Sequence, residues 1–373
     1  MKIVLANAWH DDNKGDCAIA LSTLAAIHRR YPGAEVRLRS LLKADDPAYP
    51  TAYRHVLLKY PDTTIEPRGW RRRRIKDADL VVLQGGSNLF VAGRRRLFGL
   101  PRLAQVLYPA WAAQRAGVPT VFLGHTLGPF PAGPARWLTK RILARSQAVV
   151  LREARSQRLA EDLGVPSNIL RTAPDLAFAI DPDESALVEH ILSTEGLRSR
   201  PFAIFALREH PYRGDETTAR LVRTLARAAR RLVDEGVVAQ IVVVAHTVGP
   251  TRVEDDRDVS HRLAEAIGHA TPVIERDLAP AELAALYGHA EVMVSVRLHG
   301  ALLALAGGTP ALAISYFTAK TEGVMDALGM GDQVASFDDV DEDQVFERAC
   351  ALIGSDVSQI AADCRRQLQD VLR

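Results

Sequence analysis

The chain has 373 residues, of which 47% are hydrophobic and 25% are charged. This composition excludes a collagen-like fibre, a disulfide-bonded scaffold and a disordered tail, and the length suffices for two domains that each have a core. The formal net charge of +2 hides an asymmetry, because residues 1–180 carry a net charge of +14 and residues 181–373 a net charge of −12. We therefore expect one half to face an anionic ligand or a membrane surface.

In the first half, short apolar runs alternate with amphipathic ones. The expected strands are Lys2–Ala8, Glu35–Arg39, Leu80–Leu83, Thr120–Leu123 and Ala148–Leu151. The expected helices are Asp16–Arg30, Arg102–Arg115, Ala135–Ala144 and Ser156–Leu163.

The second half repeats this alternation. Its expected strands are Phe202–Ala206, Gln240–Ala245, Pro272–Ile274, Val292–Val294 and Ala311–Ile314, and its helices include Thr217–Val233, Val259–Ile267, Ala281–Tyr287 and His299–Ala306. Runs such as 241–244 are apolar on both faces, as is typical of parallel strands that helices cover on both sides.

This alternation predicts an α/β protein with two Rossmann-like, doubly wound domains that face a cleft. We place the domains at residues 1–180 and 181–373, because the charge changes sign there and Asp181-Pro182-Asp183-Glu184 interrupts the pattern. The last helix could pack back on the first domain. Ligands of such sheets bind at the carboxyl ends of the strands.

Three polar, glycine-containing loops are expected at successive strand ends of the first domain. Asn13, Gly15 and Asp16 come after the first strand, where they can cap a helix and shape a pocket. Gln84-Gly85-Gly86-Ser87-Asn88 and Gly124-His125-Thr126-Leu127-Gly128-Pro129 follow later strands. A simple helix cap remains an alternative at the first loop, but three such loops in series favour ligand binding.

Two further strand ends carry cationic side chains. Arg152 follows the strand that ends at Leu151, and its guanidinium could clamp a carboxylate or phosphate, or bridge the domains in an ion pair. Ser295, Arg297 and His299 lie between a buried strand and an apolar helix. The next strand delivers Ser315, Tyr316 and Lys320 to the same edge. We expect Arg297 and His299 to be functional.

Two arginine runs, Arg71–Arg74 and Arg94–Arg96, lie in a segment of local net charge +8 between residues 68 and 102. The ordinary interpretation is a solvated surface. Few aromatic residues are interleaved, so nucleic acid is not the expected partner. Anionic lipid headgroups or a lipid diphosphate fit this basic segment better.

No secretion signal is expected, because the apolar start is short and runs into His10-Asp11-Asp12. Cys17, Cys350 and Cys364 are an odd number without CxxC spacing, which argues against a disulfide framework or a zinc site. The longest uncharged run is interrupted by Gly307-Gly308-Thr309-Pro310. We therefore expect a cytoplasmic protein that could attach peripherally to the inner face of the membrane, without a metal or a cofactor.

At these residues the chain resembles the polysaccharide pyruvyl transferase family. The resemblance extends over nearly the whole chain and is carried by motifs in both halves. These are Asn13-Lys14-Gly15-Asp16, Gly85-Gly86, Gly128-Pro129, Leu151-Arg152-Glu153-Ala154-Arg155-Ser156, Pro174-Asp175, Ser295-Val296-Arg297-Leu298-His299 and the segment Tyr316–Gly323 that contains Lys320. One departure is Ser87, at a position where the family frequently has a third glycine.

The resemblance implies a GT-B-like fold and the transfer of pyruvate from phosphoenolpyruvate to a sugar as a ketal. It also implies that Arg152, His299 and Lys320 line the phosphoenolpyruvate site. Arg297 and Ser295 belong to the same expected site, and His299 is the expected general acid because imidazolium donates a proton near neutral pH.

The basic first domain is the expected acceptor side. The acceptor, a glycan that could be lipid-linked, is expected at Asn13, Gly15, Asp16, Gly85, Gly86 and Ser87, with Asp16 as a candidate base.

Two other functions remain open. A nucleotide-sugar glycosyltransferase of the same fold commonly holds the ribose with a carboxylate in the helix after the glycine-rich turn. No Asp or Glu occurs between Val292 and Thr321. A basic scaffold or nucleic-acid-binding protein is the third candidate, and steeply salt-dependent binding of DNA or RNA would reveal it.

Overall fold

The computed structural model describes the whole chain apart from residues 47, 48, 50, 70–74, 92–98, 131–132, 211–212, 251–253, 317–319 and 373. It divides into two compact units. Unit 1 comprises residues 1–11, 19–176 and 367–373, and unit 2 comprises residues 12–18 and 177–366. The arginine runs Arg71–Arg74 and Arg94–Arg96 both lie outside the described residues, so their expected lipid contacts stay a prediction.

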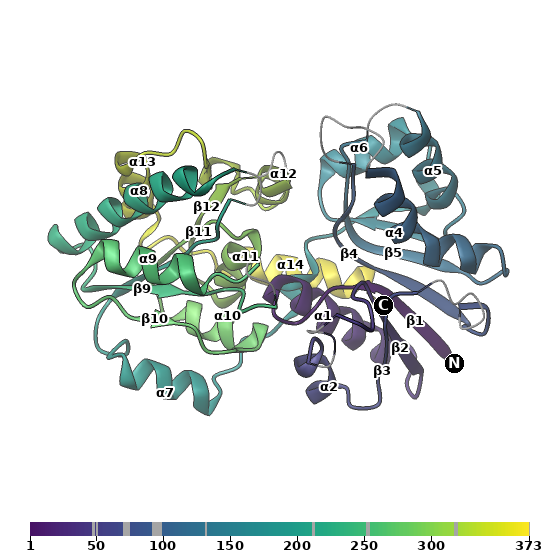
Figure 1. Ribbon diagram of the computed structural model, residues 1–373, viewed down its shortest axis with the longest axis horizontal. Coiled ribbons are helices and arrows are strands. Elements are labelled where there is room, and N and C mark those ends of the chain that lie inside the picture. Colours follow the sequence, from purple (N-terminus) through teal and green to yellow (C-terminus); the bar gives the residue numbers. More distant parts are fainter. Residues whose placement is uncertain are drawn as a thin grey trace. The chain divides into compact units, whose positions relative to one another are not determined.

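Unit 1 is built on a seven-stranded sheet with the order β3-β2-β1-β4-β5-β6-β7 (Figure 1). All of its described strand pairs are parallel. The strands are β1 (Lys2–Ala8), β2 (Glu35–Ser40), β3 (Thr64–Glu66), β4 (Leu80–Leu89), β5 (Thr120–Leu127), β6 (Ala148–Leu151) and β7 (Leu170–Thr172). The helices are α1 (Lys14–Arg30), α2 (Arg54–Lys59), α4 (Gly99–Gln114), α5 (Pro134–Leu143) and α6 (Ala154–Asp162).

Unit 2 contains a six-stranded parallel sheet with the order β10-β9-β8-β11-β12-β13. The strands are β8 (Phe202–Ala206), β9 (Gln240–Val244), β10 (Val273–Ile274), β11 (Val292–Ser295), β12 (Ala311–Ser315) and β13 (Val334–Ser336). The helices are α7 (Ala186–Thr194), α8 (Asp215–Asp234), α9 (Arg257–Ile267), α10 (Pro280–Gly288), α11 (Leu298–Gly307), α12 (Lys320–Ala327), α13 (Glu342–Leu352) and α14 (Ser358–Val371).

Each unit has its own apolar core. In unit 1 the helix α4 packs Leu103, Val106 and Leu107 into a cluster with Val81 and Leu83 of β4. The core of unit 2 combines alternate residues of β8, β9 and β11 with one face of α8. Strands that are buried on both faces and joined by helices explain why the apolar runs were continuous rather than alternating.

Helix ends in unit 2 follow local sequence signals. The side chain of Asp341 accepts a hydrogen bond from the Gln344 amide at 2.8 Å and starts α13. The side chain of Glu282 accepts one from the Ala279 amide at 2.7 Å and starts α10. The helix α11 ends at Gly308, whose φ of 93° is the left-handed conformation that glycine adopts at low cost.

Two predicted loops of unit 1 are strand in the structure. Gln84–Asn88 lies inside β4, and residues 124–127 complete β5. Register shifts occur at both places, beside Gly86 and Gly124, whose φ values are 118° and 74°. The glycines therefore mark β-bulges, which the alternation of apolar and polar residues does not distinguish from loops.

Short sequence segments join the opposite unit. Residues 12–18 cluster with unit 2 rather than with the first half of the chain. They contain Asn13 and, in the first turn of α1, Gly15 and Asp16. The last residues, from Gln367 onward in α14, cluster with unit 1. The loop Asn13–Asp16 must therefore be considered together with the second sheet.

Candidate functional site

The carboxyl ends of the unit 2 strands bring polar side chains to one edge of the sheet. Arg208 lies two residues after β8, His246 two residues after β9 and Asp277 three residues after β10. Arg297 and His299 follow β11. Because the strands are parallel, these residues share the edge at which doubly wound sheets bind ligands.

The turn from β11 into α11 is fixed by Ser295. Its hydroxyl accepts a hydrogen bond from the Arg297 amide at 3.2 Å and donates one to the Arg297 carbonyl at 2.7 Å. A Cβ atom on Gly300 would lie 2.4 Å from the Ser295 Oγ atom, so only glycine fits there. Ser295 therefore shapes the turn that presents Arg297 and His299.

Arg297 is buried against a carboxylate. Its Nε and Nη2 atoms donate to Asp256 at 2.9 and 2.6 Å, and Nη2 also donates to the Glu254 carbonyl at 2.8 Å. Although burial alone would lower the pKa of Arg297, the charge of Asp256 raises it. Its Nη1 atom makes no hydrogen bond to the described residues, so it keeps donors for an anion.

The first turn of α1 packs directly against His299. A Cβ atom built on Gly15 would lie 2.0 Å from the His299 Nδ1 atom and 2.2 Å from Cγ. The neighbouring Lys14 is 1% exposed and forms an ion pair with Asp277. Asn13 pairs with Thr247 through an isolated antiparallel bridge. The loop that the sequence assigned to the acceptor thus contacts the imidazole of His299 through Gly15.

A second histidine, His246, lies buried beside this cluster. Its Nδ1 atom and the Tyr287 hydroxyl are hydrogen-bonded at 3.1 Å, and Nε2 has no partner among the described residues. Burial lowers the pKa of His246 well below its ordinary value, and the charges of Arg297, His299 and Lys14 lower it further. His246 is therefore neutral at physiological pH and is unsuited to act as a general acid.

Arg208 adds another cation to this edge. Its Nη1 atom donates to the Tyr316 hydroxyl at 2.8 Å, and the guanidinium lies 4.8 Å from the centre of the Tyr316 ring. Burial and the nearby charge of Arg297 lower the pKa of Arg208. Two guanidinium groups that repel each other at a strand edge are typical of an anion site. Lys320 begins α12 just after the undescribed residues 317–319.

The structure places Arg152 in unit 1, at the end of β6. It is 1% exposed, and its guanidinium donates to Asp175 at 2.6 Å, to Thr126 at 2.8 Å and to Ser87 at 2.8 Å. These contacts explain Ser87 and Asp175 as partners of a buried charge. Contact of Arg152 with a substrate stays a prediction.

Gly85 is explained by the pairing of two strands. A Cβ atom there would lie 2.3 Å from the carbonyl oxygens of Leu123 and Gly124 on β5. The missing side chain of Gly85 therefore allows β4 and β5 to approach each other closely. An acceptor role of Gly85 and Gly86 stays a prediction.

The second sheet thus brings together Asn13, Gly15, Asp16, Ser295, Arg297 and His299. Sequence reasoning missed Lys14, Arg208, His246 and Asp256 as members of this site. Arg208 and His246 follow their strands by two residues, as Arg297 does, so the same rule of strand ends could have found them. Asp256 could not be found this way, because its link to Arg297 spans 41 residues.

This edge of the sheet can bind an anion next to the imidazole of His299. No group of three His, Cys, Asp or Glu side chains suited to a metal ion occurs within the described part of the chain. What the edge offers are the cations of Lys14, Arg208 and Arg297 and the ring of His299. Such a set can hold a small anion and exchange a proton with it.

Comparisons with known proteins identify the family of this chain. The model of the family described as Polysaccharide pyruvyl transferase matches residues 13–316. The chain is also 25% identical to the amylovoran biosynthesis protein AmsJ of Erwinia amylovora over 270 residues, which are 70% of this chain and 62% of AmsJ. The chain thus matches less than two thirds of that relative's length.

Solved structures show the same fold at low sequence identity. A putative UDP-N-acetylglucosamine 2-epimerase from Listeria monocytogenes is 12% identical with a TM-score of 0.61, over 96% of this chain and 90% of that one. Anabaena Alr3699/HepE in complex with UDP-glucose is 13% identical with a TM-score of 0.59, over 100% and 99%. The predicted GT-B-like architecture with two Rossmann-like domains is confirmed.

The buried ion pair of Arg152 and Asp175 gives a first test. Asp175→Ala should destabilise unit 1 by about 3–5 kcal/mol, because it leaves a buried guanidinium without its counter-charge. Urea unfolding measures this loss. Arg152→Met/Asp175→Leu should recover most of it. Equal stability of Asp175→Ala and the parent protein would contradict the burial of an ionised pair.

A second test uses His125 in β5. Both ring nitrogens are buried without a partner among the described residues, and burial, with a smaller contribution from Arg152, lowers the pKa of His125 to about 3 from an ordinary 6.5. The unfolded chain then binds the proton more tightly, so stability is complete above pH 6.5 and falls as the pH decreases toward 3.

Lowering the pH from 7.5 to 5.0 should cost the parent protein about 2 kcal/mol more unfolding free energy than it costs His125→Gln. Urea unfolding of both proteins at the two pH values measures this difference. Parallel pH dependences would show that folding does not lower the pKa of His125.

Proposed function

Because the chain belongs to the polysaccharide pyruvyl transferase family, we propose that it transfers the pyruvyl group of phosphoenolpyruvate to a sugar of a polysaccharide or its lipid-linked precursor. The product would be a pyruvate ketal. The relative AmsJ is named for the biosynthesis of amylovoran, and the description of the family names a polysaccharide, which supports a glycan acceptor. The observation that carries the proposal is the position of His299 among Lys14, Arg208 and Arg297.

The donor explains the charges of this edge. Phosphoenolpyruvate combines a carboxylate and a phosphate on a three-carbon unit, so its site needs several cations within a small space. In this proposal the free Nη1 donors of Arg297 and the guanidinium of Arg208 hold these groups and stabilise the departing phosphate. Lys320 assists as a further cation. The ion pair with Asp256 orients Arg297.

Protonation of the donor begins the reaction. Imidazolium at His299 gives its proton to C3 of the enol, which leaves an oxocarbenium-like C2. One sugar hydroxyl attacks C2, and its proton goes through a base, for which Asp16 is the candidate, back to His299. A second hydroxyl then displaces phosphate from C2, and its proton leaves with the phosphate. The two new C2–O bonds of the ketal replace the C2–C3 π bond and the bond between C2 and the phosphate oxygen.

A nucleotide-sugar glycosyltransferase is the alternative that the fold suggests, since the Anabaena protein was solved with UDP-glucose. The helix α11 carries no carboxylate that could hold a ribose, whereas the cationic Arg297 immediately precedes its first turn. The donor therefore separates the two proposals. Release of phosphate from phosphoenolpyruvate supports the first, and release of UDP from a sugar nucleotide supports the second.

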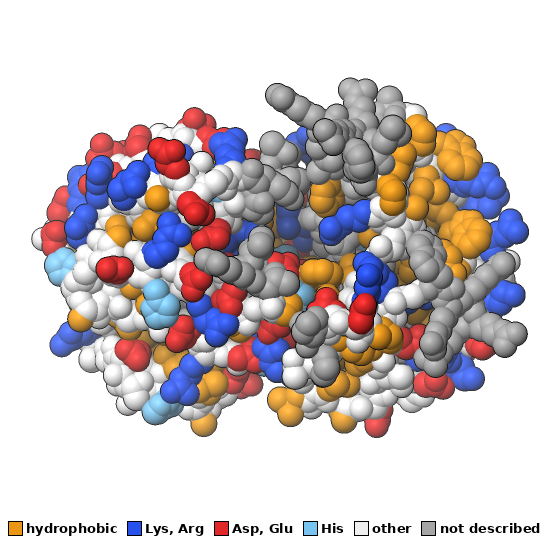
Figure 2. All heavy atoms as spheres, in the orientation of Figure 1, with side chains coloured by type: hydrophobic (Ala, Val, Ile, Leu, Met, Phe, Trp, Pro, Cys, Tyr) orange, Lys and Arg blue, Asp and Glu red, His pale blue; other side chains and the backbone are white. Residues whose placement is uncertain are grey.

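We also propose that the protein attaches peripherally to a membrane. No described helix combines the length and apolar character that crossing a bilayer requires. Hydrophobic side chains gather on the visible face of unit 1 near α4 and α5 (Figure 2). These helices expose Trp111 and Trp137, which lie beneath the guanidinium groups of Arg115 and Arg141. Tryptophan beside arginine suits the interface of an anionic bilayer.

His299→Ala should lower the rate of phosphate release from phosphoenolpyruvate in the presence of acceptor by about 100- to 10,000-fold. The fold should persist, because the change removes side-chain atoms at the edge of the sheet. His261→Ala is the matched control, since His261 is 57% exposed and pairs with Glu275 on the surface. Near-normal turnover of His299→Ala would remove His299 from the mechanism.

Gly15→Ala tests the packing that places the imidazole. The new Cβ atom would overlap the His299 ring, so the ring must move, and turnover should fall about 100-fold. Gly214→Ala is the control, because a Cβ atom there meets no atom within 4 Å. Adding Gly15→Ala to His299→Ala should cause little further loss. Full activity of Gly15→Ala would show that the position of the ring is not critical.

A further inference from the structure

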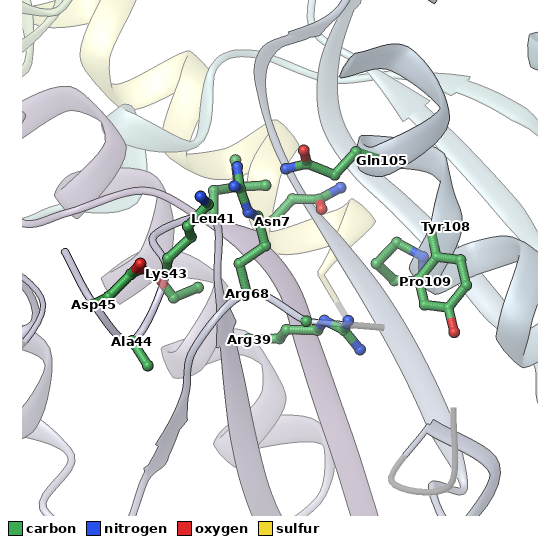
Figure 3. Close-up of a pocket in the computed structure, with 12 residues that line it drawn as sticks. Asn7, Arg39, Leu41, Lys43, Ala44, Asp45, Arg68, Gln105, Tyr108 and Pro109 are labelled. Carbon is green, nitrogen blue, oxygen red and sulfur yellow. The ribbon is translucent and has the colours of Figure 1, made fainter. Parts of the chain in front are cut away.

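Unit 1 contains a pocket of about 400 Å3 that the site described above does not include. It lies where β1 and β2 end, against one face of α4 (Figure 3). Pockets of this size hold small organic ligands. Its polar lining includes Asn7, Arg39, Lys43, Arg68, Gln105 and Tyr108.

The decisive residue of this pocket is Arg39. Only 6% of its surface is exposed, yet its guanidinium makes no hydrogen bond and no ion pair with the part of the chain that the structure describes. It faces the ring of Tyr108 at 5.6 Å. Burial lowers the pKa of Arg39, and the attraction of Tyr108 and Glu66 offsets this only in part. Among the arginines that the structure describes, the other two buried ones, Arg152 and Arg297, each hold a carboxylate, whereas the donors of Arg39 remain unused.

Two more cations face the same space. Figure 3 shows the side chains of Lys43 and Arg68 directed to one region of the pocket, and Arg39 extending from β2 toward Tyr108. Neither Lys43 nor Arg68 forms an ion pair with a described residue. Asp45 is the one acidic residue of the described lining, so positive charge is in excess. Excess cations with unused donors favour an oxyanion.

Amide groups complete the lining in a way that suits hydroxyl groups. The Nδ2 atom of Asn7 donates to the Val106 carbonyl at 3.0 Å, which fixes the orientation of the amide. Asn7 holds a φ of 69°, a conformation that costs energy outside glycine and is concentrated at binding sites. Gln105 offers a second amide from α4. A sugar that bears a negative group matches this combination.

We infer that this pocket binds the acceptor through an oxyanion attached to its sugar, with Arg39 and Arg68 contacting the phosphate or carboxylate oxygens. The inference rests on the proposed function for its sugar acceptor, while the binding of an anionic sugar can be measured without any transfer reaction. Two sources share this chemistry: the phosphate that joins a sugar to a carrier, and the carboxylate of a uronic acid.

Isothermal titration of the full chain with glucose 1-phosphate, methyl glucuronide and neutral methyl glucoside tests the inference. At least one anionic sugar should bind at least tenfold more tightly than methyl glucoside. Arg39→Gln and Arg68→Gln should each remove most of this preference. Arg37→Gln is the matched control, because Arg37 lies in the same strand but pairs with Glu35 and does not line the pocket.

Thermal unfolding of each variant without ligand checks that the variant is folded. Since Arg39 is buried without a counter-charge, Arg39→Gln should unfold at a temperature no lower than Arg37→Gln. If Arg39→Gln fails to fold, Arg68→Gln, which is only half-buried, decides the outcome. Preference for glucose 1-phosphate would identify a carrier phosphate, and preference for methyl glucuronide an acidic sugar.

The inference is overturned if both anionic sugars bind no better than methyl glucoside, or if the Arg39 and Arg68 variants bind them as Arg37→Gln does. Such a result would leave the pyruvyl transfer itself untouched. Conversely, binding of glucose 1-phosphate through Arg39 without release of phosphate from phosphoenolpyruvate would support the pocket and contradict the proposed reaction.

Discussion

The candidate site depends on the contact between the imidazole of His299 and the backbone of Gly15. The ring occupies the space that a Cβ atom on residue 15 would take, so the His299 side chain packs directly against the backbone of the first turn of α1. This contact groups residues 12–18 with the second sheet. It also places Lys14, through its ion pair with Asp277, beside the ends of the strands. A rigid imidazole among cations is what proton transfer to a bound anion requires.

The buried arginines differ in how many of their guanidinium donors have an acceptor in the protein. We use this difference to distinguish arginines that hold the fold from arginines that could bind a ligand. Arg152 is satisfied by Asp175, Thr126 and Ser87, and it holds the strand ends of unit 1 together. Arg297 is held on two of its nitrogens and retains the third. Arg39 is buried without an acceptor among the described residues. A buried guanidinium without a counter-charge is costly, so its unused donors favour an anionic ligand, as we infer for Arg39.

The sequence predicted the architecture well, because parallel strands buried on both faces leave continuous apolar runs. The strands β1, β6 and β8 were predicted with their observed bounds. It predicted Gly86 and Gly124 as loop residues, since a β-bulge and a loop both use glycine with polar neighbours. It could not assign the loop Asn13–Asp16 to the second sheet or pair Arg297 with Asp256, because both depend on contacts between distant segments. The sequence did not predict the pocket around Arg39 for the same reason, since the lining of this pocket comes from β1, β2, α4 and the loops between them.

The most direct measurement of the central claim is mass spectrometry of a glycan acceptor after incubation with the protein and phosphoenolpyruvate. The account predicts a product heavier than the acceptor by one pyruvate less one water, together with an equal amount of inorganic phosphate. The product should lose pyruvate on mild acid treatment, as a ketal does. An acceptor that gains a hexose from a sugar nucleotide instead, with phosphoenolpyruvate left intact, would contradict the account.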